Sequence, residues 1–180
     1  MGAALTLAWE GREAGEAGVE AVGFDELYEA HRQRAYRLAL LLCGGERPLA
    51  EDALSEAFIR VFPKWHGGHV DDFGPYLRRA VVNEVKRMFT RRGLQRRSEP
   101  PLDLDAVTLA SPEDQVVRRQ LVWSALQTLP VKQRTAFVLH YYEALPVEEV
   151  ADAMGTSVGT AKSHLSRGRD RLRVLLEERL

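Results

Sequence analysis

The segment 147–173 carries side chains of the types and spacing that bind DNA. Two helical patterns flank Gly155, and Ser157 precedes the second, where its hydroxyl can cap the helix and leave free amides for a phosphate. Apolar residues follow one side of the second helix and basic residues the other. Polar side chains on such a helix contact base edges in the major groove, and cations contact phosphates. The residues predicted to bind DNA here are Ser157, Thr160, Lys162, Ser163, Ser166 and Arg167.

An ordinary helical hairpin with a solvated basic face is the alternative interpretation of this segment. A helix-turn-helix needs a small residue in its first helix and a tight turn, and Ala151 and Gly155 supply them. Together with the basic stripe they favour DNA binding.

A second basic face is predicted on a helix over about 75–90. Helical spacing places Arg79, Asn83 and Lys86 on one side, with Arg78 and Arg87 flanking them. Asparagine has poor helix propensity, and an amide that contacts a base edge would explain Asn83, although a solvated surface asparagine is the alternative. Trp65 and His66 are predicted in the loop before this helix, where aromatic rings could stack on unpaired bases.

Other motifs point away from catalysis and metal binding. His66 and His69 lack a neighbouring cysteine pair or acidic cluster, so we predict no metal site. The sequence has no Gly-rich phosphate loop, no HExxH motif and no nucleophile elbow, so we predict neither an enzyme nor a cofactor. Asp52, Glu56 and Arg60 share one face of a helix over 48–64, where spacing alone favours surface ion pairs of about 0.3–0.5 kcal/mol each.

Hydrophobic periodicity predicts the elements that position these residues. Helices over about 24–43, 48–64 and 75–90 would share one core, with Phe62 and Tyr76 among the buried residues. Between 91 and 114 the periodicity fails, prolines appear and the charge changes from basic to acidic, as in a flexible linker. Helices over about 113–129, 131–143, 147–154 and 158–178 follow. We therefore predict an all-α protein with a disordered tail (1–22), a three-helix domain (23–91), a linker (92–114) and a helix-turn-helix domain (115–178), the two domains joined by the flexible linker.

The distribution of charge and the composition indicate a nucleic-acid-binding protein that is not inserted in a membrane. The net charge is only −1, yet eight Lys or Arg residues lie between positions 78 and 97 against the single acid Glu84. No apolar run approaches the roughly 18 residues of a membrane span, and the first residues lack the cationic start of a secretion signal. Cys43 lies alone in an apolar run and is predicted to be a buried small hydrophobe. We predict a cytoplasmic protein without membrane insertion.

The two halves together resemble a bacterial sigma factor. The blocks FDELYEAHRQRAYRLALLL, AEDALSEAFIRVFPKW and YLRRAVVNEVKRMF resemble region two of the extracytoplasmic-function (ECF) RNA polymerase sigma factors, group 4 of the sigma-70 family. The block LQTLPVKQRTAFVLHYYEALPVEEVADAMGTSVGTAKSHLSRGRDRLR resembles region four. The subgroup that it resembles most is actinobacterial.

This resemblance implies partners and roles for the residues above. Asp52, Glu56 and Arg60 would contact core RNA polymerase, which the family binds through its clamp coiled coil and flap. Asn83 and its basic neighbours, with the loop 65–72, would bind the minus-10 promoter element. The residues 157–167 named above would read the minus-35 element. The resemblance also implies an anti-sigma factor as partner, and a specificity subunit in place of an enzyme.

A stand-alone helix-turn-helix regulator is the competing prediction. Such a protein would carry a sensing domain at its N-terminus and would bind duplex DNA by itself, usually as a dimer. It would leave the basic face around Asn83 unexplained.

Overall fold

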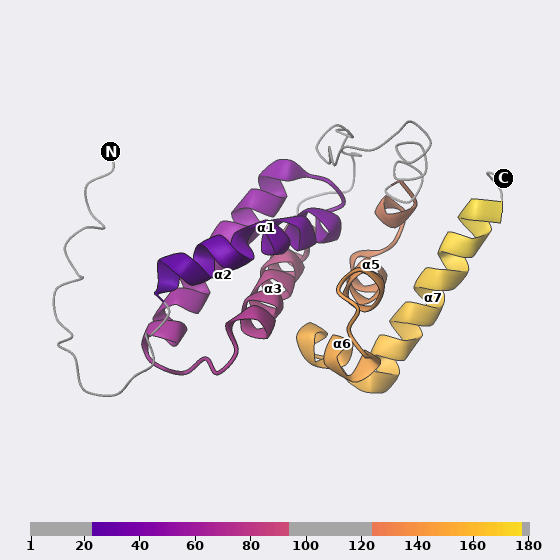
Figure 1. The fold of residues 1–180 in the computed structure, drawn as a ribbon. Helices are drawn as coiled ribbons and strands as arrows, with labels where there is room; N and C mark the ends of the chain where they lie inside the picture. Colours follow the sequence, from indigo (N-terminus) through magenta and orange to yellow (C-terminus); the bar gives the residue numbers. More distant parts are fainter. Residues whose placement is uncertain (1–22, 94–123, 178–180) are drawn as a thin grey trace, which may run out of the picture.

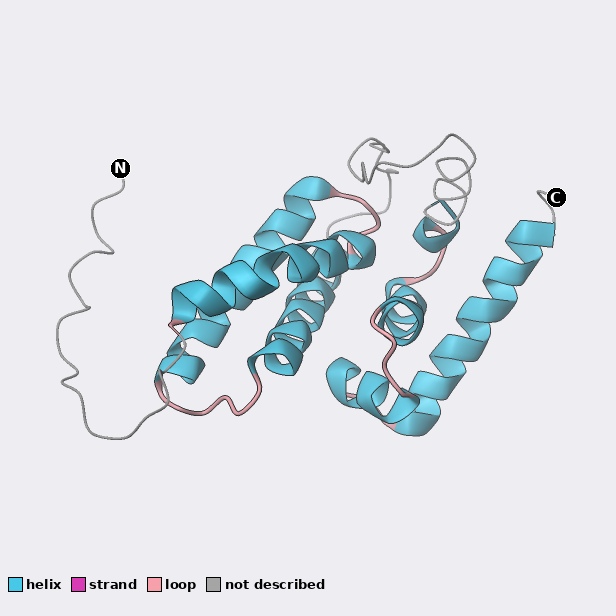
Figure 2. Cartoon of the chain, viewed as in Figure 1, coloured by secondary structure: helices cyan, strands magenta, loops and turns pink. Residues whose placement is uncertain are grey.

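The computed structural model describes residues 23–93 and 124–177, with side chains as far as residue 174. Every regular element in these two ranges is a helix, which confirms the predicted all-α class (Figures 1 and 2). The predicted tail (1–22) and nearly all of the predicted linker (92–114) lie outside the described residues.

Three helices form the N-terminal unit: α1 (Phe24–Leu42), α2 (Arg47–His66) and α3 (Phe73–Gly93). Each has apolar residues at helical spacing, and their inward sides share a core in which Leu38, Val61 and Leu77 are almost completely buried. Gly44 ends α1 with a φ of 68°, a conformation that glycine adopts without strain. Cys43 is buried beside it, as predicted.

Two details of the N-terminal unit differ from the sequence-based prediction. Helix α2 extends to His66, so Trp65 and His66 lie in its last turn and not in the following loop. Phe62 and Tyr76, predicted to be buried, are 44% and 36% exposed. A three-helix unit covers only part of each helix, and Phe62 lies at its edge, where its ring meets Phe24 edge-on at 4.8 Å.

The C-terminal unit contains a short helical segment at 124–127 and the helices α5 (Val131–Phe137), α6 (Val147–Met154) and α7 (Val158–Glu177). The single helix predicted over 131–143 is divided, because its last part is a π-helix, η1 (Val138–Tyr142). The amide of Glu143 donates to the carbonyl of Val138 at 3.1 Å, an i→i+5 bond. Helix α6 and helix α7 form the predicted helix-turn-helix.

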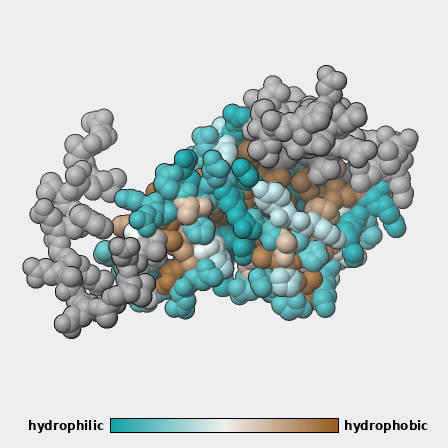
Figure 3. Space-filling view, in the orientation of Figure 1, coloured by the Kyte–Doolittle hydropathy of each residue, from teal (hydrophilic) through white to brown (hydrophobic). Residues whose placement is uncertain are grey.

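The two units are docked on each other, a contact that the sequence-based prediction of two domains joined by a flexible linker did not include. Their buried apolar residues form one continuous cluster. Helix α3 contacts α5 and α6, and α1 contacts α5 and η1. In the view of Figure 3, hydrophilic side chains cover most of the described surface, broken by smaller hydrophobic patches. Docking leaves Asn83, Lys86 and the outer side of α7 exposed.

Candidate nucleic-acid interface

The turn between α6 and α7 has the hydrogen bonds of a Schellman motif. Gly155 adopts a left-handed conformation, its amide donates to the carbonyl of Asp152 at 3.0 Å, and the amide of Thr156 donates to that of Ala151 at 2.9 Å. Because glycine has no Cβ, it accepts this conformation at little cost. The turn fixes the direction in which α7 leaves α6, and Gly155 therefore has the role that the sequence predicted for it.

Ser157 caps α7, as predicted. Its Oγ accepts a hydrogen bond from the amide of Thr160 at 3.2 Å and lies 2.8 Å from the Thr160 hydroxyl. Such a cap satisfies one of the free amides at a helix N-terminus. The hydroxyls of Ser157 and Thr160 are thus paired with each other at the exposed end of the helix.

Helix α7 separates its apolar and polar sides. Ala161, Leu165 and Leu172 are buried against the rest of the unit, and Gly168 lies against the backbone of Gln133. Four of the predicted DNA-contacting side chains are exposed on the other side: Lys162, Ser163, Ser166 and Arg167. The Ser163 hydroxyl donates to the carbonyl of Gly159 at 2.9 Å, which leaves its oxygen free to accept a bond.

His164 is a residue of this helix that the sequence analysis did not single out. Its Nδ1 is buried without a hydrogen-bond partner. Burial lowers the pKa of His164, and the nearby Lys132 and Arg167 lower it further. The imidazole therefore adds no cation to the basic side of α7 at neutral pH.

The second basic face lies on α3, as its spacing predicted. Arg79, Asn83 and Lys86 are exposed at i, i+4 and i+7. The flanking arginines are differently placed: Arg78 is mostly buried and donates to Glu143 of the C-terminal unit at 3.1 Å, and Arg87 donates to Glu84 at 2.9 Å. Both guanidinium groups are already paired with carboxylates.

Glu84 is a buried acid that the sequence analysis counted only as one charge. Only 5% exposed, it pairs with Arg60 of α2 and Arg87 of α3. A buried carboxylate needs such partners, because its transfer from water is otherwise costly. Its spacing from Leu77 and Val81 places it on the inward side of α3, a signal that was available in the sequence.

The face of α2 that carries Asp52 and Glu56 is exposed. Arg60 lies 3.9 Å from Glu56, the predicted i,i+4 pair, and makes its closer contact with Glu84. Ile59 shares this face at i+7 from Asp52 and is 65% exposed, the largest value among the exposed large hydrophobic residues of the described ranges. Ile59 was not predicted from the sequence, although its place outside the buried apolar stripe of α2 was an available signal.

Trp65 and His66 lie at the end of α2, close to the loop that leads to α3. The Trp65 ring is half-buried with its centroid 5.4 Å from that of Phe24, and the His66 ring stacks on Phe62 at 5.9 Å. The exposed His66 is therefore the more accessible of the two rings.

Among the described residues, no group of three or more His, Cys, Asp or Glu side chains is arranged to hold a metal ion. None of the helices in the described ranges is both long and apolar enough to cross a membrane.

Two protein-family models match the chain, one over each of its two structural units. Residues 27–95 match the family model of sigma-70 region 2, and residues 119–172 match that of sigma-70 region 4. The ECF RNA polymerase sigma factor SigE of Mycolicibacterium smegmatis is 36% identical over 155 residues, which are 83% of this chain and 60% of that protein. The RNA polymerase sigma-E factor of Streptomyces avermitilis is 35% identical over 133 residues, 72% of each chain.

A solved structure has a similar fold. The sigma factor RpoE of Bartonella quintana, crystallised with the anti-sigma factor NepR, aligns with a TM-score of 0.66 and 22% sequence identity. The alignment covers 86% of this chain and 96% of that one. At this identity the likeness concerns the fold alone.

Proposed function

Because the chain belongs to the ECF RNA polymerase sigma factors, we propose that it directs core RNA polymerase to specific promoters and assists promoter opening at initiation. The observation that supports this proposal is the presence of two separate exposed faces with cationic and polar side chains in one chain, on α3 and on α7. The exposed side of α7 suits intact duplex, and the exposed face around Asn83 of α3 suits a second, different DNA element.

The helix-turn-helix unit reads the minus-35 element in this proposal. Lys162, Ser163, Ser166 and Arg167 enter the major groove, where hydroxyls and cations meet base edges and phosphates. The capped N-terminus of α7 adds the positive end of a helix dipole close to the backbone. We assign this unit to residues 115–178.

The three-helix unit, residues 23–91, binds the minus-10 element. Asn83 contacts a base edge, and Arg79 and Lys86 hold the backbone on either side. His66 and the loop up to residue 72 receive a base that has left the stack, with Trp65 packed behind them. Removing a base from the stack costs a few kcal/mol, which contacts to the unpaired base and to phosphates offset.

Helix α2 binds core polymerase through its exposed face. Asp52, Glu56 and Arg60 supply charges of both signs, and Ile59 supplies apolar area at the centre of that face. Attachment to polymerase brings both DNA-binding units to the promoter at once, so modest affinities of each unit combine. The chain is then a specificity subunit, and polymerase supplies the catalysis.

An anti-sigma factor is a further partner in this proposal. The Bartonella sigma factor with the similar fold was crystallised with one. A stand-alone regulator is less well supported, because it has no use for a second DNA-binding face on α3.

The test is transcription by core polymerase supplemented with the purified chain. We expect promoter-specific transcripts, and we expect Asn83→Ala to reduce them about tenfold while its co-elution with core is unchanged, since a good bidentate base contact is worth about 1–3 kcal/mol. Gln33→Ala, at an exposed position of α1, is the matched control. Parent-level transcription by Asn83→Ala would remove Asn83 from the proposed contact, and a parent without promoter-specific transcripts would contradict the function itself.

A further inference from the structure

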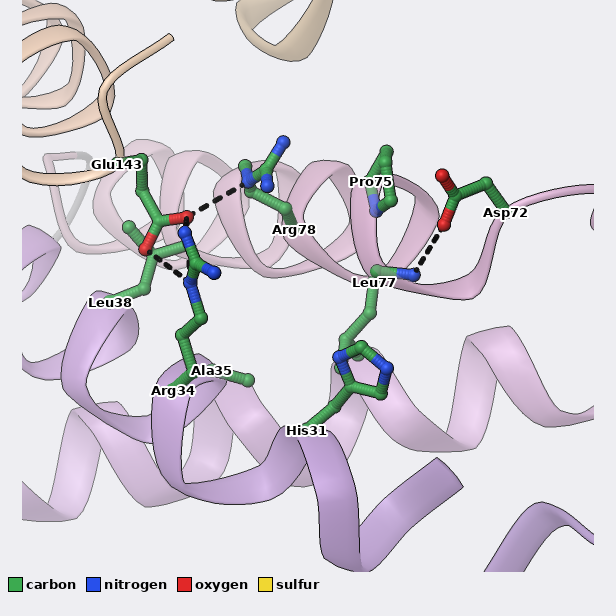
Figure 4. A pocket seen from close by; sticks show the side chains of 10 residues that line it. His31, Arg34, Ala35, Leu38, Asp72, Pro75, Leu77, Arg78 and Glu143 are labelled. Carbon is green, nitrogen blue, oxygen red and sulfur yellow. Dashed lines mark hydrogen bonds and ion pairs between the residues drawn. The ribbon is translucent and has the colours of Figure 1, made fainter. Parts of the chain in front are cut away.

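Glu143 joins the two units of the protein. Its side chain is 2% exposed, and it accepts hydrogen bonds from Arg34 of α1 and Arg78 of α3. Nη2 of Arg34 lies 2.9 Å from Oε2 of Glu143, and Nε of Arg78 lies 3.1 Å from the same oxygen. Figure 4 shows the carboxylate of Glu143 bonded to both arginines. All three side chains line an open cleft of about 250 Å³. We name Arg34, Arg78 and Glu143 the interdomain cluster.

The interdomain cluster is built differently from a surface ion pair. Arg34 is 64% exposed, yet both its Nε and its Nη2 bond the same buried carboxylate, at 3.2 and 2.9 Å, so its loss would take two charge-assisted bonds from a group that has left water. Arg78 is only 17% exposed and meets a carboxylate that has left water almost completely. Separation of the units would return this carboxylate to water, whereas removal of the arginines alone would leave a buried, unpaired charge.

Other contacts across the same interface support docking. Arg79 lies 3.4 Å from Asp152 of α6 in an exposed pair. The side-chain Nε2 of Gln127 donates to the carbonyl of Gly44 at 2.7 Å, and the buried guanidinium of Arg134 lies 5.6 Å from the ring centroid of Phe89. Consequently two arginines of the proposed minus-10 face, Arg78 and Arg79, meet carboxylates of the C-terminal unit where DNA would offer phosphates.

We propose that the interdomain cluster is an autoinhibitory contact, in which Glu143 holds the two units closed and competes with the promoter backbone for Arg78. The inference rests on the proposed function, since it takes the α3 face as a DNA-binding surface. In the closed form Arg78 is mostly covered and its guanidinium is paired with Glu143 in place of a phosphate. Binding of nucleic acid to Arg78 therefore requires the units to separate.

Closure lowers the apparent affinity of the free chain for DNA, because only open molecules can use Arg78. When only a fraction of molecules is open, the apparent dissociation constant for DNA equals the intrinsic constant divided by that fraction. A change that weakens the closed form raises the open fraction and tightens DNA binding, although no DNA contact is added. Any partner that binds the open form better, such as polymerase, shifts the equilibrium in the same direction.

Two single substitutions in the full-length chain test the proposal. Glu143→Gln removes the buried charge, and Arg34→Gln removes one of its partners without touching a residue of the proposed DNA-binding faces. Glu148→Gln makes the same charge change as Glu143→Gln at an exposed position of α6 that has no ion pair among the described residues. The readouts are the radius of gyration by X-ray scattering and the binding of a fluorescent mixed-sequence single-stranded DNA by anisotropy.

We expect both cluster variants to expand and to bind the oligonucleotide about tenfold more tightly than the parent. Glu148→Gln should keep the dimensions of the parent. A gain for Arg34→Gln is especially informative, because loss of a cation alone weakens binding to DNA. Circular dichroism confirms that each variant is folded, and Arg34→Gln carries the test if Glu143→Gln does not fold.

Unchanged dimensions in a folded cluster variant would overturn the proposal, as would a gain in DNA binding no larger than that of Glu148→Gln. Expansion without any gain in binding would also overturn the competition for Arg78. Failure of the proposed function would appear elsewhere, as absence of promoter-specific transcripts from the parent with core polymerase, because the scattering measurement does not depend on DNA or polymerase.

Discussion

Replacing Gly168 by alanine should raise the free energy of unfolding by about 1 kcal/mol. Gly168 lies in the middle of α7, where glycine costs about 0.5–1 kcal/mol relative to alanine because it loses more conformational freedom on folding. An added Cβ would lie 3.7 Å from the Gln133 carbonyl oxygen and 3.9 Å from Cδ1 of Leu129, which are ordinary van der Waals distances. The methyl group therefore fits without displacing a neighbour.

The same substitution at Gly44 should have the opposite sign. Gly44 has a φ of 68°, which costs an alanine about 1–2 kcal/mol. Its added Cβ would also overlap Nη1 of Arg134, whose guanidinium is buried between the two units. We expect Gly44→Ala to lower the free energy of unfolding by about 2 kcal/mol or more, since strain and displacement of Arg134 add.

Guanidinium unfolding followed by circular dichroism compares the two variants with the parent. Gly168→Ala should raise the denaturation midpoint and the melting temperature, the latter by about 3 °C for a chain of this size. Gly44→Ala should lower both. A destabilised Gly168→Ala would refute the packing described between α7 and α5, and a stable Gly44→Ala would refute the close approach of Arg134 to the end of α1.

Two other predictions concern the polymerase-binding face and Cys43. Asp52→Arg should weaken association with core polymerase about tenfold or more, because it reverses a charge on the exposed face of α2. Association is measured by co-elution or anisotropy. Glu26→Arg on α1 makes the same charge change and is the control: an equal loss of association there would show that only the net charge matters. Burial raises the pKa of the Cys43 thiol to about 12, from an ordinary value near 9. Between pH 9 and 12 the thiol of the unfolded chain loses its proton while the buried thiol of the native state keeps it, so the free energy of unfolding falls as the pH rises. For each pH unit, this fall should be about 1.4 kcal/mol larger in the parent than in Cys43→Ala, which has no thiol. Parallel pH profiles of the two proteins in denaturant titrations would disprove this.

Local patterns predicted the helices and the exposed polar side of α7 well. The end of α6 at Gly155, the cap at Ser157 and the exposed row from Lys162 to Arg167 all depend on residues within a few positions of one another. Helical spacing also placed Arg79, Asn83 and Lys86 together on α3. These features follow from the 3.6-residue period and the preferences of capping residues.

Features that depend on distant residues were not predictable in this way. The pairing of Glu143 with Arg34 and Arg78 joins positions more than sixty residues apart, and no periodicity relates them. Exposure of Phe62 depends on how far the neighbouring helices extend over it. The burial of Glu84 was the exception, since its place on the inward side of α3 was visible from the spacing to Val81.

The π-helical turn at Val138–Tyr142 gives the chain room for a change of length just before Glu143. A π-turn accommodates one residue more than an α-turn, so deletion of a single residue there would restore regular α-helix. Because the wider turn and the extra residue would be lost together, the acid would stay on nearly the same side of the helix. Related chains that lack one residue in this turn should therefore keep an acid that can meet both arginines.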